Sequence, residues 1–227
     1  SGAYFQNCLL GVCEPASLLG YNVLITTSNV HDISELQSLV ESNRVDGMLL
    51  TRALEDDRAL QYLSQVNFPT ALTGTCRYDN IIQVDTDNEG AAEKMTTLLI
   101  GKGFRRFAFL VKNMSYNVDR KRHEGFCRAL IKNGISEKDQ LFYNGSIRME
   151  FLDAIIENII SKKVECIICG DDEICTMVMS RLQAEGYRIP KDVAIASLYN
   201  STNLDCYSPA VTAVSVAASQ MGGAAVR

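Results

Sequence analysis

This 227-residue sequence contains no apolar run long enough to cross a membrane and no recognisable secretory leader. A membrane-spanning helix needs about 20 consecutive apolar residues. A leader places a shorter apolar segment behind basic residues. The sequence therefore predicts no spanning segment and no export signal within these residues.

Histidine is also scarce, since only His31 and His123 are present. Neither is spaced from a cysteine or from the other histidine as zinc ligands are. The G-x-S-x-G, Walker and G-x-G-x-x-G motifs are missing too. The adjacent Asp171 and Asp172 suit either acid–base chemistry or the capping of a helix, and capping is the simpler interpretation. We expect no metal, no cofactor and no enzymatic activity.

Positive charge is in deficit: 22 Lys and Arg stand against 27 Asp and Glu, a formal net charge of −5. The densest basic run is 120–123, and Glu124 follows it at once. Proteins that grip nucleic acid neutralise phosphates with clustered basic side chains. We therefore expect that these residues do not read DNA by themselves.

Eight cysteines are present, but their spacing does not suggest a disulfide framework. This usage is typical of reduced thiols in a cytosolic protein. Cys166 and Cys169 form a C-x-x-C within a predicted strand, where their side chains point to opposite faces. We interpret this pair as structural.

The most informative stretch runs from Val164 to Val214. An apolar run over 164–169 predicts a buried strand, which Gly170 ends. A helix with one apolar face follows, Gly186 and Pro190 stop it, and 193–196 predicts a second strand. In such a βαβ unit a ligand lies beyond the carboxyl ends of the strands, here at 170–172 and 197–200.

The remaining pattern also alternates. Strands are predicted at 22–26, 47–50, 70–73, 81–84 and 107–111, and helices at 33–41, 58–65, 89–100, 120–133 and 150–161. Regular alternation of this kind predicts an α/β protein with parallel sheets covered by helices on both faces.

Ordered motifs along nearly the whole chain resemble the effector-binding core of the lactose-repressor (LacI/GalR) family of transcriptional regulators. The matching segments are 3–5 with Gly11, 44–47, 87–88, 103–106, 122–126, 171–172, 186–195 and 208–214. The resemblance implies two doubly wound parallel-sheet lobes of the periplasmic-binding-protein-like type I. The first lobe would contain 1–111 and 216–227, and the second 112–215. The family's helix-turn-helix head, first strand and C-terminal strands are expected to lie outside this chain.

The resemblance also implies binding residues. Arg122 occupies the place of an effector-contacting arginine, whose rigid fork of five donors suits hydroxyls, carbonyls or carboxylates. Tyr4 and Phe5 would form an aromatic wall for a ligand or, equally, pack the first helix. Asp171 stands where the family has Asn, so its charge would face the ligand while Asp172 caps the helix. Tyr199 replaces an aspartate of sugar-responsive relatives, which argues against an ordinary sugar effector.

The implied function is that of a cytoplasmic, homodimeric regulator core. A small-molecule effector would bind between the lobes, and lobe closure would control operator binding by the absent heads. Residues Ile33, Leu36 and Val40, or the final helix from Ala217, are candidate dimer contacts. Two alternatives are a solute-binding protein of a transporter, which shares this architecture, and an enzyme on a doubly wound fold.

Overall fold

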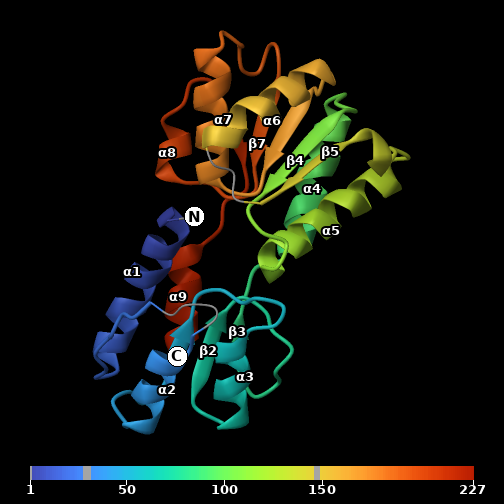
Figure 1. Ribbon diagram of the computed structural model, residues 1–227. Helices are drawn as coiled ribbons and strands as arrows, with labels where there is room; N and C mark the ends of the chain where they lie inside the picture. The colour runs from blue at the N-terminus through green and yellow to red at the C-terminus, as the bar shows by residue number, and fades with distance from the viewer. Residues whose placement is uncertain (1, 28–31, 146–148) are drawn as a thin grey trace. The chain divides into compact units, whose positions relative to one another are not determined.

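The computed structural model describes residues 2–27, 32–145 and 149–227 and divides them into two compact units (Figure 1). The large-sheet unit consists of Asp87–Met114 and Val118–Val216. The small-sheet unit consists of Gly2–Thr86, Ser115–Asn117 and Ala217–Arg227. The strand pairs of both sheets are parallel, which confirms the expected α/β class with two parallel sheets.

The large-sheet unit is built on a five-stranded sheet in the order β5-β4-β6-β7-β8. Its strands are β4 (Phe107–Val111), β5 (Leu141–Asn144), β6 (Cys166–Cys169), β7 (Ala194–Ser197) and β8 (Thr212–Ala213). Its helices are α4 (Asn88–Gly101), α5 (Asn117–Lys132), α6 (Met149–Ser161), α7 (Asp172–Ala184) and α8 (Thr202–Asp205), with a 3₁₀ turn at Glu137–Asp139.

Both faces of this sheet are covered, as the continuous apolar strands require. Alternate residues of β4 separate into two cores: Leu110 packs with α6 and α7, whereas Phe109 packs with α4 and α5. The same alternation places Cys169 in the first core and Cys166 in the second. This confirms the structural interpretation of the C-x-x-C, and burial raises the pKa of the Cys166 thiol to about 12.

The small-sheet unit contains three strands in the order β1-β2-β3: Met48–Leu50, Thr70–Thr73 and Ile82–Val84. Helices α2 (Ser34–Glu41) and α3 (Arg58–Gln65) pack against this sheet through Leu36 and Leu63. Asp57 caps α3 by accepting hydrogen bonds from the amides of Ala59 and Leu60. Among the described residues, no helix combines the length and apolar character needed to cross a bilayer.

The strand predicted at 22–26 does not form. This segment is extended coil, and Val23, Leu24 and Ile25 are 39%, 62% and 56% exposed. A strand exists only where a neighbouring strand supplies its backbone partners. In the described part of the chain, β1 pairs with β2 and no ladder reaches 22–26.

The boundary between the units also differs from the expected one. Residues 87–111 were expected in the first lobe, but they belong to the large-sheet unit. The physical reason is the apolar stripe of α4, in which Ala92, Met95 and Leu99 pack against Phe107 and Phe109 of β4. Helix α4 and strand β4 thus share a core with the chain that follows them. The chain changes unit at Thr86 instead of Val111.

Helices α1 (Gly2–Leu18) and α9 (Ala218–Val226) pack closely side by side in the small-sheet unit (Figure 1). The contact depends on glycine. A Cβ atom at Gly11 would lie 1.9 Å from the backbone oxygen of Ser219, and one at Gly222 would lie 2.1 Å from that of Cys8. Backbone atoms cannot yield as flexible side chains do, so the helices would have to separate.

We therefore expect Gly11→Ala to destabilise the protein by at least about 2 kcal/mol, in the upper range for overpacked cores. Urea unfolding followed by circular dichroism measures this change. Gly101→Ala is the matched control, because Gly101 ends α4 and an added Cβ meets no atom within 4 Å. Equal midpoints for the two variants would contradict the close α1–α9 contact.

Candidate functional site

The strand order of the large-sheet unit reverses between β4 and β6. From β4 the chain passes through α5 to β5 on one side, whereas from β6 it passes through α7 to β7 on the other. Helices α5 and α7 cover opposite faces of the sheet. Two such diverging connections open a crevice at the carboxyl ends of the adjacent strands, the usual ligand position in open parallel sheets. Those ends are Val111–Lys112 and Cys169–Gly170.

A cluster of charged side chains lies at this edge. The Lys112 ammonium is 2.7 Å from Oδ2 of Asp171 and also pairs with Glu173. Burial lowers the pKa of Lys112, but the two carboxylates outweigh it and the net pKa is raised. For Asp171, burial raises the pKa, yet the amide of Ile174 and the Lys112 charge leave it lowered. Both groups are therefore charged at neutral pH.

Arg122 lies at the same edge. Its Nη1 donates to the carbonyl oxygen of Gly170 at 2.6 Å, and its Nε donates to Oδ1 of Asn88 at 3.2 Å. Arg122 is 9% exposed. It thereby ties the N-terminus of α4 to the turn after β6. The nearby Asp119 accepts a hydrogen bond from the amide of Asn113, but burial raises the pKa of its carboxyl group.

Asp171, and not Asp172 as expected, caps the helix that starts at this turn. Asp171 is the N-cap of α7: its backbone is extended, and Oδ1 accepts from the amide of Ile174 at 2.9 Å. Asp172 is the first helical residue, is 5% exposed, and its Oδ1 is buried without a hydrogen-bond partner among the described residues. The prediction that Asp172 caps while Asp171 is left for a ligand is wrong in its first part.

Tyr199 comes just after β7, the strand next to β6, and so lies at the same edge of the sheet. It is 3% exposed. Its carbonyl oxygen accepts a hydrogen bond from Oγ of Ser197 at 2.7 Å, which fixes the turn. Asp171 and Tyr199 thus follow neighbouring strands at one sheet edge, as the βαβ pattern predicts, and Arg122 of α5 contacts the same edge through Gly170. Tyr199 is a buried ring there and contributes no charge.

The other two expected residues belong to the small-sheet unit. Tyr4 is half-buried in α1, and its hydroxyl lies 3.9 Å from Sδ of Met221 in α9. Phe5 is 41% exposed. Tyr4 therefore contributes to the packing of the first helix. This was one of the two roles expected for Tyr4 and Phe5, the other being an aromatic wall for a ligand.

Sequence reasoning missed Lys112, Asp119 and the role of Asn88. Asp87 caps α4 through the amide of Gly90, and the adjacent Asn88 accepts a hydrogen bond from Arg122. Lys112 pairs with a residue 59 positions further along the chain. The only available signal was position, because Lys112 directly follows a buried strand.

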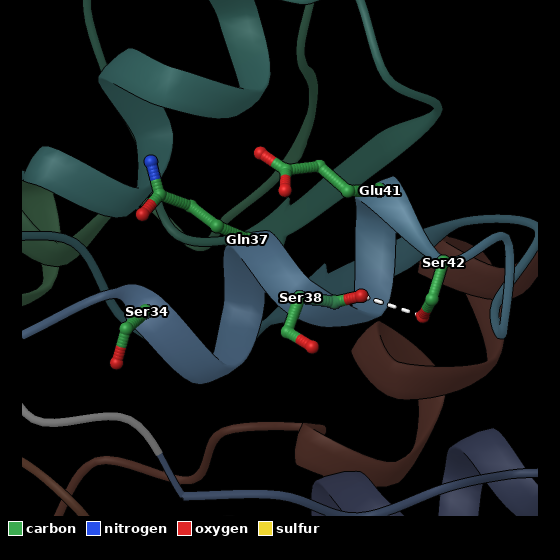
Figure 2. Close-up of a pocket in the computed structure, with 5 residues that line it drawn as sticks. All are labelled: Ser34, Gln37, Ser38, Glu41 and Ser42. Carbon is green, nitrogen blue, oxygen red and sulfur yellow. Dashed lines mark hydrogen bonds between the residues drawn. The ribbon is translucent and has the colours of Figure 1, made fainter.

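A hollow also runs along α2 (Figure 2). Gln37 is half-buried, while Ser34, Ser38, Glu41 and Ser42 are exposed, and the Ser42 hydroxyl donates to the Ser38 carbonyl. Side chains from one exposed helix face give a ligand no enclosed set of partners. The sheet edge of the large-sheet unit is the better candidate.

The features that enzymes need are not assembled in the described residues. No group of three or more His, Cys, Asp or Glu side chains there is placed to hold a metal ion. The Cys127 sulfur lies 3.6 Å from Nε2 of His123, but burial raises the pKa of this thiol to about 11 and lowers that of the imidazole. A nucleophilic cysteine requires the opposite shift of its thiol pKa. His31 lies outside the described residues.

Comparison with known proteins identifies relatives. Residues 96–227 match the periplasmic binding protein-like domain. Catabolite control protein A of Staphylococcus xylosus is 24% identical over 218 residues, which cover 94% of this chain and 66% of that protein. The chain therefore spans slightly less than two thirds of this relative.

Solved structures agree with this match. A transcription regulator-like protein from Staphylococcus haemolyticus superposes with a TM-score of 0.88 at 26% identity, covering 98% of this chain and 82% of the other. The complex of the transcriptional regulator CelR with cellobiose gives a TM-score of 0.87 at 25% identity, covering 99% of this chain and 71% of the CelR chain. With its family motifs, its two parallel sheets and these matches, the chain belongs to the periplasmic binding protein-like domain family and is homologous to the LacI-family transcriptional regulators.

Proposed function

We propose that this chain is the effector-binding and dimerisation core of a LacI-type transcriptional regulator that acts in the cytoplasm and catalyses no reaction. The observation that carries the proposal is the charged edge where the strand order reverses, with Lys112, Arg122 and Asp171 held by specific partners. The relatives are transcriptional regulators. Ligand binding would shift a conformational equilibrium of the whole regulator.

Arg122, Asp171 and Tyr199 are the proposed effector contacts of the large-sheet unit, and Tyr4 and Phe5 those of the small-sheet unit. Arg122 fits this role because its Nη1 already holds the Gly170 carbonyl beside Asp171. A ligand that engages the guanidinium would therefore be coupled to the turn that starts α7.

Operator contact is assigned to a helix-turn-helix head outside these residues. The net charge of −5 does not favour contact with DNA phosphates. A transporter solute-binding protein is the less favoured alternative, since the relatives named above are regulators. Sequencing the N-terminus of the native protein decides between them: a helix-turn-helix supports the proposal, and a secretory leader contradicts it.

The effector itself is best sought directly. Mass spectrometry of the protein purified under native conditions identifies a compound that copurifies with it. Cellobiose, the ligand in the CelR complex, is a suitable first probe for titration calorimetry. Tyr199 predicts weak cellobiose binding, because a tyrosine makes fewer hydrogen bonds to sugar hydroxyls than a carboxylate does.

For Arg122→Ala we expect affinity for the copurifying effector to fall about ten- to a hundred-fold, as for the loss of a charge-assisted hydrogen bond. Stability should fall as well, because the Gly170 carbonyl and the Asn88 amide oxygen lose their donor. Titration calorimetry and thermal melting at matched temperatures separate the two effects.

Glu124→Gln is the control for the Arg122 variant. Glu124 lies on the same helix in an exposed ion pair with Arg120, so both affinity and melting temperature should stay near wild type. Unchanged affinity in Arg122→Ala, measured where that variant is fully folded, would place the effector site elsewhere.

The dimer contacts expected from the sequence already have packing partners within the small-sheet unit. Leu36 is buried in the small-sheet unit's own core, and Ile33 and Val40 pack against it. The final helix packs against α1. Exposed apolar side chains occur instead at Leu10, Leu18 and Leu19, with exposures of 70%, 82% and 54%.

We therefore expect the chain to form a two-fold dimer, the commonest closed oligomer, through these exposed side chains of α1 and the turn that follows it. Sedimentation velocity at micromolar concentrations should show dimers for the wild type and a shift towards monomer for Leu10→Glu. Leu98→Glu is the control, because Leu98 is 50% exposed on α4. A shift of equal size in both variants would contradict this assignment, as would a monomeric wild type.

A further inference from the structure

Two buried oxygen atoms in the large-sheet unit have no hydrogen-bond partner among the residues that the structure describes. One is Oδ1 of Asp172, and the other is Oγ of Ser201. Their residues are only 5% and 6% exposed. Buried polar groups are almost always paired, so an unpaired one requires an explanation.

The two residues occupy corresponding places in the fold. Strands β6 and β7 are adjacent and parallel, with Cys169 opposite Ser197. The amide of Leu198 also donates to the Cys169 carbonyl, which continues the pairing past the end of β7. Asp172 follows Cys169 by three residues, and Ser201 follows Ser197 by four. Both therefore lie beyond the carboxyl ends of neighbouring strands.

The packing of the following helices keeps the two residues in the same region. Leu204 of α8 belongs to the same core cluster as Ile174 and Cys175 of α7. Ser201 is the N-cap residue of α8, but its side chain makes no capping bond. Its hydroxyl group is therefore not used by the helix that it precedes.

The electrostatic balance of this edge is negative. Four carboxylates against two cations leave an excess of two negative charges, counting Asp119, Asp171, Asp172 and Glu173 against Lys112 and Arg122. Lys112 is engaged by Asp171 and Glu173, and Arg122 by Gly170 and Asn88. No described cation is shown paired with Asp172.

We propose that Asp172 and Ser201 form a subsite for an ammonium group of the effector. A carboxylate only accepts hydrogen bonds, a hydroxyl accepts as well as donates, and an ammonium group supplies three donors and a positive charge. It would satisfy both oxygens and offset the negative excess, whereas a phosphate or carboxylate group would be repelled. The effector is then a cationic amine. This inference rests on the proposed function, since it concerns the same sheet edge.

The first test needs no ligand. Asp172→Asn removes an unpaired buried charge, so the melting temperature of the ligand-free protein should stay the same or rise by about 2–4 °C. Asp171→Asn is the matched comparison: an Asn still caps α7, but the ion pair with Lys112 is lost, so its melting temperature should fall. A fall in Asp172→Asn as large as in Asp171→Asn would show that Asp172 has a structural partner and would overturn the proposal.

The second test compares three probes on one sugar ring by titration calorimetry of the whole chain: glucosamine, glucose and glucose 6-phosphate. We expect glucosamine to bind most tightly, and Asp172→Asn to weaken it about ten- to a hundred-fold. Ser201→Ala should weaken it less. Asp153→Asn is the control for charge, since Asp153 is an exposed residue of α6 paired with Arg181.

The outcomes separate this inference from the proposed function. Tighter binding of glucose or glucose 6-phosphate, or no binding of any probe, contradicts an ammonium subsite. If Arg122→Ala weakens glucosamine binding and Asp172→Asn does not, the subsite is wrong and the effector role stands. If neither Arg122→Ala nor Asp172→Asn weakens glucosamine binding, the effector role of this edge is contradicted as well. That role is also tested independently with the copurifying compound.

Discussion

The reversal of strand order between β4 and β6 is the constraint on which the candidate site depends. Because the chain leaves these adjacent strands in opposite directions, α5 and α7 cover opposite faces and neither closes the edge between them. Gly170 lies at this point, and a Cβ there would come within 3.1 Å of the Leu110 carbonyl oxygen. The close approach brings the turn after β6 within reach of both Lys112 and Arg122.

The charges at this edge also hold the fold together. Arg122 joins the start of α4 to the turn after β6, and Lys112 joins the end of β4 to the start of α7. Each contact connects segments far apart in the sequence. In the function that we propose, ligand recognition and the internal order of the large-sheet unit share side chains, so mutational tests here need a stability measurement beside each affinity.

The sequence allowed the two strands and the helix between Val164 and Ser197 to be predicted, because they depend on local signals: buried apolar runs, an acidic turn and a glycine stop. Other features depend on partners that no local pattern reveals. The segment 22–26 has the composition of a strand, but no described strand pairs with it. Helix α4 belongs to the large-sheet unit because its apolar face packs against β4. The ion pair of Lys112 joins residues 59 positions apart, so only the tertiary fold reveals it.

For Asp171 and Asp172, too, the local sequence does not decide which residue caps the helix. Their side chains are identical, and either could cap a helix. The backbone decides, because Asp171 is extended at the N-cap and reaches the Ile174 amide, whereas Asp172 is already helical. One carboxylate is thereby satisfied by the fold, and the other is buried with an oxygen unpaired. A group that the fold leaves unsatisfied lowers stability unless something else binds it. This physical requirement is the reason that we propose a ligand group at Asp172.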